Sequence, residues 1–149
     1  IRVVVAAPFQ YCTSLTTIVV DKTNPIFDSR EGCNAIIKTK DNSLIVGCGA
    51  TKIPSSVKCI DKYAFMGCLV EELAIPDGVE RINFFAFSSC PNLKKIAIPA
   101  SVGANVTAAH GSPNITAIEI KYHFVYCVLT TPTTFIINLL NELRISQLP

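Results

Sequence analysis

The central part of the chain carries a hydrophobic pattern that repeats. In residues 53–68 an Ile-Pro pair is followed by a valine, an isoleucine, an Ala-Phe pair and a cysteine, and the same residues recur 22 positions later. The repeated positions are Ile53, Pro54, Val57, Ile60, Ala64, Phe65 and Cys68, then Ile75, Pro76, Val79, Ile82, Ala86, Phe87 and Cys90. A repeat this short cannot bury its own apolar face, so successive copies must stack and share one core.

A short apolar alternation within each copy predicts a strand. The pattern Leu-x-x-Ile-x-Ile, as in "LKKIAI" at residues 93–98, places alternate side chains inward and the residues between them outward. Stacked copies then form a parallel sheet with strands about 4.8 Å apart. "IPDGV" at residues 75–79 predicts the corner, because proline fixes a backbone angle and Asp-Gly favours a turn. "YAFMGC" and "FAFSSC" return the chain on the opposite side, with Phe and Cys in the interior.

Weaker copies flank the central pair and give about five coils in total. Upstream, Val4, Phe9 and Cys12 stand where the repeated Ile, Phe and Cys stand, and "LTTIVV" at residues 15–20 matches "LKKIAI". Downstream, a copy begins at residue 98, loses its Ala-Phe and Cys, and recovers as "PNITAIEI" at residues 113–120. Because all copies share one core, a single domain over residues 1–149 is expected.

The central coils resemble a known repeat family. "IPSSVKCIDKYAFMGC" and "IPDGVERINFFAFSSCPNLKKIAIP" are similar to the BspA-like, or Treponema-type, leucine-rich repeats of bacterial cell surfaces. The resemblance covers roughly residues 1–135 and departs from the pattern in the fifth coil and over residues 136–149. It implies an α/β leucine-rich-repeat solenoid, a right-handed horseshoe of mostly short parallel strands with irregular or short helical convex segments. It also implies a secreted or surface-exposed setting and a role in adhesion or ligand binding.

An insertion separates the first coil from the second. Ile53 follows Val20 by 33 residues, eleven more than one repeat, and the excess lies in "CNAIIKTKDNSLIVGC" at residues 33–48. Two apolar segments around a polar turn predict a β-hairpin. The favoured interpretation is a coil whose loop extends from the sheet edge. The alternative is a protruding contact element that carries Lys38, Lys40 and Asp41.

Three of the seven cysteines, Cys12, Cys68 and Cys90, share one repeat position and are expected in the core as small hydrophobic residues. Adjacent coils place Cys68 and Cys90 within disulfide range, but parallel Cα–Cβ vectors disfavour a bridge.

The other four cysteines lie outside that position. Cys33 and Cys48 bracket the hairpin, so a disulfide across it is an alternative to two free thiols. Cys59 is expected to face outward or to lie at a coil edge, and Cys127 belongs to the atypical closing segment, residues 121–149.

The sequence favours no catalytic, metal or cofactor site. No Cys-x-x-Cys spacing is present, and the histidines are His110 and His123 alone. A thiol enzyme built on Cys90 and His110 is a remote alternative, because a buried repeat position disfavours a thiolate. No Gly-rich phosphate loop or nucleophile elbow occurs, so no cofactor is predicted.

The outward face of the stacked strands is the candidate binding surface, because repeat proteins present such a face as an extended concave surface. By the alternation rule this face carries Thr17, Val19, Lys52, Glu72, Ala74, Lys95, Ala97, Ala117, Glu119 and Lys121. The expected partner is a protein or glycan, of host origin if the resemblance holds. A purely structural spacer within a larger surface protein is the alternative.

Composition supports a globular binding module. The 149 residues are 50% hydrophobic and 16% charged, which excludes a disordered chain. The net charge of +2 comes from scattered residues, which argues against nucleic acid or a basic membrane anchor. No apolar stretch approaches the roughly 18 residues of a membrane span.

The two ends of the chain suggest a further contact. Residue 1 falls within a repeat, which would leave an apolar coil edge for another coil, a cap or a partner chain. Near the other end, Phe135, Ile136, Leu139, Leu140 and Leu143 follow a helical spacing. A short amphipathic helix is therefore expected there, as a cap or as a contact in a homodimer through the open ends.

Overall fold

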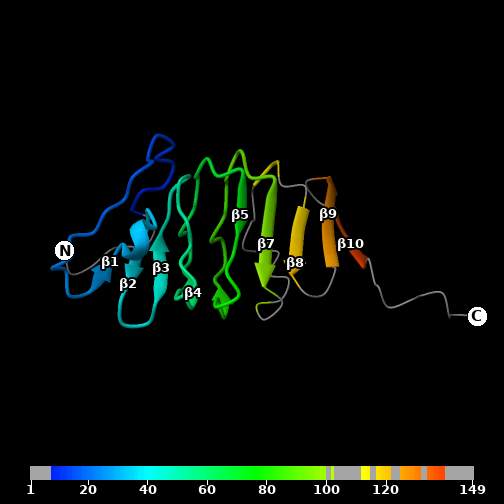
Figure 1. The fold of residues 1–149 in the computed structure, drawn as a ribbon. Helices are drawn as coiled ribbons and strands as arrows, with labels where there is room; N and C mark the ends of the chain where they lie inside the picture. The colour runs from blue at the N-terminus through cyan, green and yellow to red at the C-terminus, as the bar shows by residue number, and fades with distance from the viewer. Residues whose placement is uncertain are drawn as a thin grey trace, which may run out of the picture.

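The computed structural model describes residues 8–99, 102, 112–114, 117–121, 125–131 and 134–139, the last three segments through their backbone. Most of the regular structure is short strands (Figure 1). The elements are β1 (Phe27–Asp28), the 3-10 turn η1 (Arg30–Gly32), β2 (Ile36–Lys38), β3 (Ser43–Val46), β4 (Cys59–Ile60), β5 (Glu72–Ala74), β6 (Arg81–Ile82), β7 (Lys95–Pro99), β8 (Ala117–Lys121), β9 (Val125–Thr131) and β10 (Thr134–Leu139).

The strands form two sheets that the chain visits in turn. Sheet A has the order β1-β2-β3-β4-β6, and sheet B has the order β10-β9-β8-β7-β5. The pairs β3–β4, β4–β6, β5–β7 and β7–β8 are parallel, whereas the pairs β1–β2, β2–β3, β8–β9 and β9–β10 are antiparallel. Because β4, β5, β6 and β7 alternate between the sheets, each coil contributes one strand to each sheet. The predicted stacking is confirmed, with two parallel ladders where the sequence indicated one.

The registers follow the repeat. Ile60 pairs with Ile82 at the repeat length of 22 residues, whereas Leu73 pairs with Ile96, one residue further on. The difference arises because "CPNLKKIAIP" is one residue longer than "CLVEELAIP". The extra residue lies before the strand and leaves the inward pattern of the strand unchanged.

The Ile-Pro corners stack directly on one another. Val57 N donates to Pro54 O at 3.1 Å, and Val79 N donates to Pro76 O at the same distance one coil later. A Cβ on Gly78 would lie 2.2 Å from the backbone oxygen of Ser55. The corner therefore needs glycine because the preceding coil passes against it.

The side of each coil opposite the corner consists of tight turns, which we call the turn edge: residues 8–13, 62–67 and 84–89. Backbone bonds join these turns, as Gly67 N donates to Ser88 O at 3.0 Å and Tyr11 N donates to Met66 O at 3.4 Å. These turns contain no helix, so they are the irregular form of the convex segments expected from the sequence.

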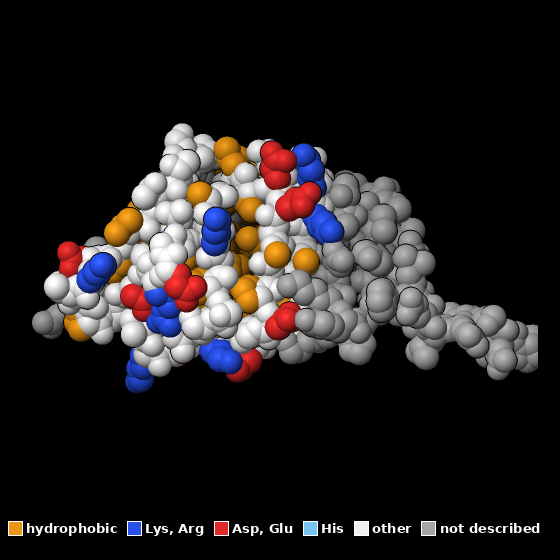
Figure 2. Space-filling view, in the orientation of Figure 1, with side chains coloured by type: hydrophobic (Ala, Val, Ile, Leu, Met, Phe, Trp, Pro, Cys, Tyr) orange, Lys and Arg blue, Asp and Glu red, His pale blue; other side chains and the backbone are white. Residues whose placement is uncertain are grey.

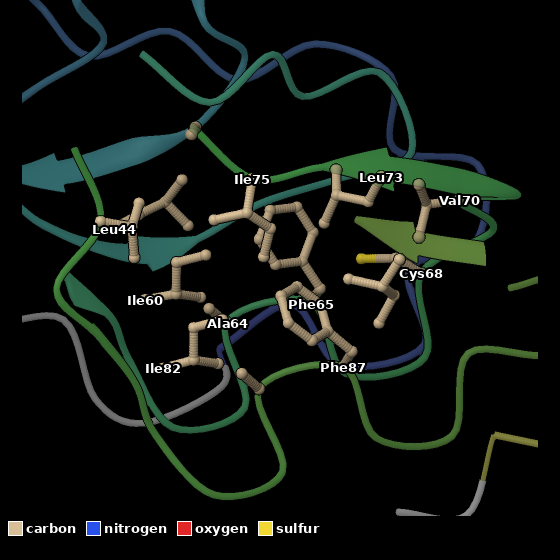
Figure 3. Close-up of a cluster of buried hydrophobic side chains, with 14 of the residues drawn as sticks. Leu44, Ile60, Ala64, Phe65, Cys68, Val70, Leu73, Ile75, Ile82 and Phe87 are labelled. Carbon is tan, nitrogen blue, oxygen red and sulfur yellow. The ribbon is translucent and has the colours of Figure 1, made fainter. Parts of the chain in front are cut away.

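One core lies between the two sheets and the turn edge (Figure 3). Leu44, Ile60 and Ile82 follow one another from sheet A, and Phe65 and Phe87 lie beside them with ring centroids 5.3 Å apart. Both phenylalanines are at most 1% exposed. Burial of each such side chain contributes roughly 1.5–3 kcal/mol, which makes these stacked positions the main source of stability.

The repeated cysteine position forms a buried hydrogen-bond ladder. Cys68 Sγ donates to Gly47 O at 3.5 Å and Cys90 Sγ donates to Phe65 O at 3.0 Å. Ser112 lies 22 residues after Cys90, and its Oγ donates to Phe87 O at 2.7 Å. The interior placement of Cys68 and Cys90 is confirmed as free thiols. Ser112 takes the cysteine position in the fifth coil, where the sequence pattern indicated no equivalent residue.

The first coil departs from its expected structure. Phe9 is 43% exposed, Cys12 is an exposed free thiol, and residues 15–20 form no strand. The cause is the hairpin, because Gly47 N donates to Ala64 O at 2.8 Å, the bond that corresponds to Phe65 N to Ala86 O. The hairpin therefore fills the place against Phe65 that Phe9 would have taken. Val4 lies outside the described residues.

The hairpin itself is present, as β2 and β3 pair antiparallel and β1 adds a third strand. Arg30 joins β1 to the turn of the hairpin, with Nε and Nη2 on the two oxygens of Asp28 at 2.8 and 2.6 Å and Nη1 on Asn42 Oδ1 at 2.8 Å. The same Nη1 approaches Ser56 Oγ at 3.4 Å, which ties the hairpin to the next coil.

Cys33 and Cys48 do not form the alternative disulfide. Both are free and buried, and they belong to different hydrophobic clusters. Cys33 packs in the central core, whereas Cys48 packs with Ile18 and Val46 in a second, smaller cluster. The hairpin directs the two sulfur atoms to separate environments.

Cys59 is buried at 3% exposure, so its predicted outward position is wrong. It lies in β4 between Ser43 and Arg81, and Asn83 Nδ2 approaches its sulfur at 3.7 Å. Neighbouring strands and the Asn83 side chain cover the face of β4 that was expected to be open.

The closing segment is strand rather than helix. Thr134–Leu139 forms β10, antiparallel to β9, and β9 is antiparallel to β8. The helical prediction is therefore wrong for Phe135, Ile136 and Leu139, while Leu140 and Leu143 lie outside the described residues. The run Thr-Thr-Phe-Ile-Ile is rich in residues that favour strands, and the edge of sheet B gives it a partner.

Candidate ligand-binding faces

The outward face of β5 and β7 brings four of the predicted residues together. Glu72 pairs in register with Lys95, and Ala74 pairs with Ala97, while Leu73 and Ile96 between them are buried. Glu72 and Ala74 are exposed and Lys95 and Ala97 are partly exposed. We call this surface the sheet B face. It is a flat row of small side chains beside a row of charged ones.

β8 extends the sheet B face by register. Ala117 pairs with Lys95, Glu119 with Ala97 and Lys121 with Pro99. The two alanine positions of β5 and β7 are thus followed by an acidic position on β8. The strand expected within "PNITAIEI" is confirmed as β8, and the order of the three strands is the predicted one.

Three other predicted residues do not join this face. Thr17 and Val19 are exposed, but they lie in a segment that packs against the hairpin through Ile18. Lys52 is exposed outside any strand, and its backbone N donates to Cys33 O at 3.0 Å. The hairpin thus removes the first two coils from the predicted surface.

Charged side chains pair between successive coils next to both sheets. Lys94 Nζ lies 3.2 Å from Glu71 Oε2 before the strands of sheet B, and Lys58 Nζ lies 2.9 Å from Glu80 Oε1 before the strands of sheet A. Figure 2 shows acidic and basic side chains next to one another, with hydrophobic side chains nearby. Because these pairs are largely exposed, each contributes at most about 1 kcal/mol. These ion pairs therefore determine the charge pattern of the surface more than the stability of the fold.

The turn edge presents an aromatic surface that the sequence prediction missed. Tyr63 and Phe85 occupy equivalent positions and stack with centroids 5.8 Å apart and ring planes 12° apart. Lys62 Nζ lies 4.7 Å from the Tyr63 centroid, and Phe84 is 60% exposed. The available signal was the aromatic residue directly before each repeated Ala-Phe, in "YAF" and "FAF".

No deep pocket accompanies either face in the described part of the chain. The best-defined hollow, between Phe9, Gly47 and Tyr63, has a volume of about 10 Å³. That volume is about the size of one water molecule, whereas small-molecule sites are clefts of several hundred Å³. The two faces therefore suit a macromolecular or polymeric ligand.

The buried thiols are unsuited to nucleophilic chemistry. Burial raises the pKa of Cys90 to about 11 and that of Cys68 to about 12. Both sulfur atoms also donate to backbone oxygens, which holds the thiols protonated. His110 lies outside the described residues. Among the residues that are described, no cluster of three His, Cys, Asp or Glu side chains is arranged to hold a metal ion.

Comparisons with known proteins add a family match. Residues 47–134, more than half of the chain, match the family model described as "BspA type Leucine rich repeat region" in six copies. Comparison with curated protein sequences gives no match. Among solved structures, a leucine rich cell surface protein from Faecalibacterium prausnitzii A2-165 is similar at 22% sequence identity and a TM-score of 0.29. That similarity covers 76% of this chain and 44% of the other, so the chain spans less than half of its length.

Proposed function

Because the chain belongs to the BspA-type leucine-rich repeat family, we propose that it is a non-catalytic module that binds a protein or glycan ligand through the sheet B face. The proposal places the module at the cell surface or in the secreted fraction, as the family resemblance implies, on an open solenoid of the horseshoe kind. No nucleic acid or cofactor takes part. In the described segments no helix is long and apolar enough to cross a membrane.

The proposal rests on which residues occupy the outward positions of sheet B. Alanine is depleted in strands, where branched and aromatic side chains pack better. Ala74 and Ala97 nevertheless occupy neighbouring outward positions, and Ala117 lies one strand further along the row of Glu72 and Lys95. Small side chains do little for an isolated sheet, but they let a partner approach the backbone closely.

Charge completes the surface. Glu72 and Lys95 lie side by side on adjacent strands in the row next to the alanine row, and Glu119 follows Ala97 by register on β8. A rim of both signs gives orientation rather than attraction to one sign of charge, because polar rims contribute mainly to specificity. A neutral or mixed-charge partner therefore fits this face better than a polyanion.

A structural spacer is the second candidate. Its support is that Lys58–Glu80 and Glu71–Lys94 are satisfied within the molecule and join successive coils. Such internal pairs would stiffen a stack without any ligand.

An array of matrix proteins and polysaccharides distinguishes the two. We expect the isolated chain to bind at least one member, and Ala97→Arg to weaken that binding about tenfold or more, because a long side chain would fill the approach to the face. Thr17→Arg is the matched control, since Thr17 is exposed but lies outside sheet B. An array with no bound member favours the spacer, and equal losses for both variants would place the contact elsewhere.

A further inference from the structure

The turn edge carries an exposed aromatic and cationic group in two successive coils. Tyr63 and Phe85 stack between the coils, and Lys62 Nζ lies 4.7 Å from one ring centroid and 5.9 Å from the other. Phe84 makes no ring contact within the described residues and is 60% exposed. Phe84 takes in its coil the position that Lys62 takes in the preceding coil, and Phe9 and Tyr11 of the same turn edge are also exposed. Large apolar side chains that are exposed together on one edge, rather than singly, mark an interaction surface.

The backbone at this edge is strained. Tyr63 has a φ of 64° and Phe85 a φ of 60°. A bulky residue in this left-handed region is an outlier, and such conformations cost about 1 kcal/mol or more. Glycine would remove the cost. The aromatic rings at both positions therefore offset a local penalty, in part through their mutual stacking.

Lys62 has no ion-pair partner among the residues that the structure describes. The neighbouring carboxylate, Asp61, accepts hydrogen bonds from Asn83 Nδ2 at 2.9 Å and from the backbone N of Lys62 at 2.8 Å. Asp61 is thus engaged in joining two coils, whereas the ammonium group of Lys62 remains available above the rings.

The shape of the edge favours a linear ligand. The hollow next to Tyr63 holds no more than about one water molecule in its 10 Å³, so an enclosed ligand is excluded from it. The ring-bearing turns repeat at the spacing of hydrogen-bonded backbones, about 4.8 Å, which is comparable to the length of one sugar unit in a polysaccharide.

We propose that the turn edge binds an acidic polysaccharide of the uronic-acid class. The C–H face of a sugar ring packs on Phe84, and a sugar carboxylate pairs with Lys62 above the Tyr63–Phe85 stack. This surface is separate from the sheet B face, so the inference goes beyond the function proposed above and stands or fails independently of it. An acidic peptide would satisfy Lys62, but the exposed ring of Phe84, at the equivalent position of the next coil, fits a sugar face better.

Titration of the full chain with three probes tests the inference: an oligogalacturonate, a neutral cello-oligosaccharide of equal length and poly-L-glutamate. We expect binding of the oligogalacturonate to be at least about tenfold tighter than binding of the neutral sugar, and to weaken with added salt. Lys62→Gln and Phe84→Ala should each weaken it about three- to tenfold. Both side chains are exposed, so thermal unfolding should be nearly unchanged.

Lys22→Gln and Val19→Ala are the matched controls, because both residues are exposed and lie outside the turn edge. They should leave oligogalacturonate binding unchanged. The inference is overturned if no oligosaccharide binds, if the neutral sugar binds equally well, if poly-L-glutamate is preferred, or if Phe84→Ala and Lys62→Gln bind like the unmodified chain. Ala97→Arg should not affect this binding, which separates the turn edge from the sheet B face.

Discussion

The turn at residues 8–13 and the turns at residues 62–67 and 84–89 occupy equivalent repeat positions, yet their side chains have opposite environments. Phe65 and Phe87 are at most 1% exposed, whereas Phe9 is 43% exposed. Cys90 is fully buried and Cys12 is exposed. The backbone bond from Tyr11 N to Met66 O nevertheless reproduces the one from Gly67 N to Ser88 O.

The comparison shows that a repeat position fixes where the backbone lies but not whether the side chain is buried. A buried position needs a coil on each side, because each repeat contacts only its neighbours. Gly47 of the hairpin occupies the space next to Phe65, and a Cβ there would lie 2.2 Å from Phe65 Cε1. Residues 8–13 therefore stack on the next turn at the surface of the molecule. The hairpin instead packs against Phe65 in the core.

Thiol reactivity should show the largest difference between the two regions. At pH 8 a thiol of pKa about 11, as for Cys90, is ionised in about one molecule in a thousand, and burial blocks access as well. We expect iodoacetamide to modify Cys12 in the native protein and Cys68 and Cys90 only after unfolding. Peptide mass spectrometry before and after addition of urea measures this, and rapid native labelling of Cys90 would contradict the buried ladder.

Truncation of the equivalent phenylalanines should give the next largest difference. Phe65→Ala removes a ring packed against Gly47 and Phe87 and should lower the free energy of unfolding by about 3–5 kcal/mol. Phe9→Ala is the control at the same repeat position and should cost less than about 1 kcal/mol, because its side chain is half exposed. Urea denaturation followed by circular dichroism compares them. Equal losses would mean that residues 8–13 belong to the core.

The smallest expected effect concerns Arg30, which bonds Asp28 of β1 and the turn of the hairpin. Hydrogen bonds from Arg30 hold the pKa of Asp28 below its usual value. Because the folded-state pKa is lowered, this contribution to stability is present above about pH 4 and is lost as the pH falls through the folded-state pKa. Arg30→Gln should cost about 1–2 kcal/mol at pH 7 and should reduce the loss of stability in acid.

Lys38→Gln is the matched control for the hairpin. Its pair with Asp41 is about half exposed, so a change of a few tenths of a kcal/mol is expected. Chemical denaturation at pH 7 and at pH 3 measures both variants. A larger effect for Lys38→Gln than for Arg30→Gln would show that the Lys38–Asp41 pair, rather than the contacts of Arg30, couples the hairpin to the coils.

The sequence predicted the structure best where the repeat is clearest. The pairing of Leu73 with Ile96 and the shared core of Phe65 and Phe87 could be predicted, because similar side chains recur at nearly the same spacing in successive coils. Cys59 could not be placed, because its burial depends on Asn83 and on strands of sheet A that the alternation in "LKKIAI" does not indicate. The helical spacing of residues 135–143 misled because it ignored the strand edge that β9 offers to β10.

The candidate faces were predictable to different degrees. The sheet B face followed from alternation along β5 and β7, while the loss of Thr17, Val19 and Lys52 from it depended on where the hairpin packs. The turn edge was not predicted, because the stacking of Tyr63 on Phe85 needs the actual spacing and left-handed backbone of two turns.

The sequence alone determined the coil length, the family, the corner at each Ile-Pro pair and the inward positions of the central coils, since these depend on local periodicity and on turn-forming residues. Only the tertiary structure decided which coil lies beside which, and therefore which repeated phenylalanine and thiol are buried. The physical reason is that burial belongs to a pair of neighbouring coils, and the eleven residues added at the hairpin change the neighbour without changing the repeat.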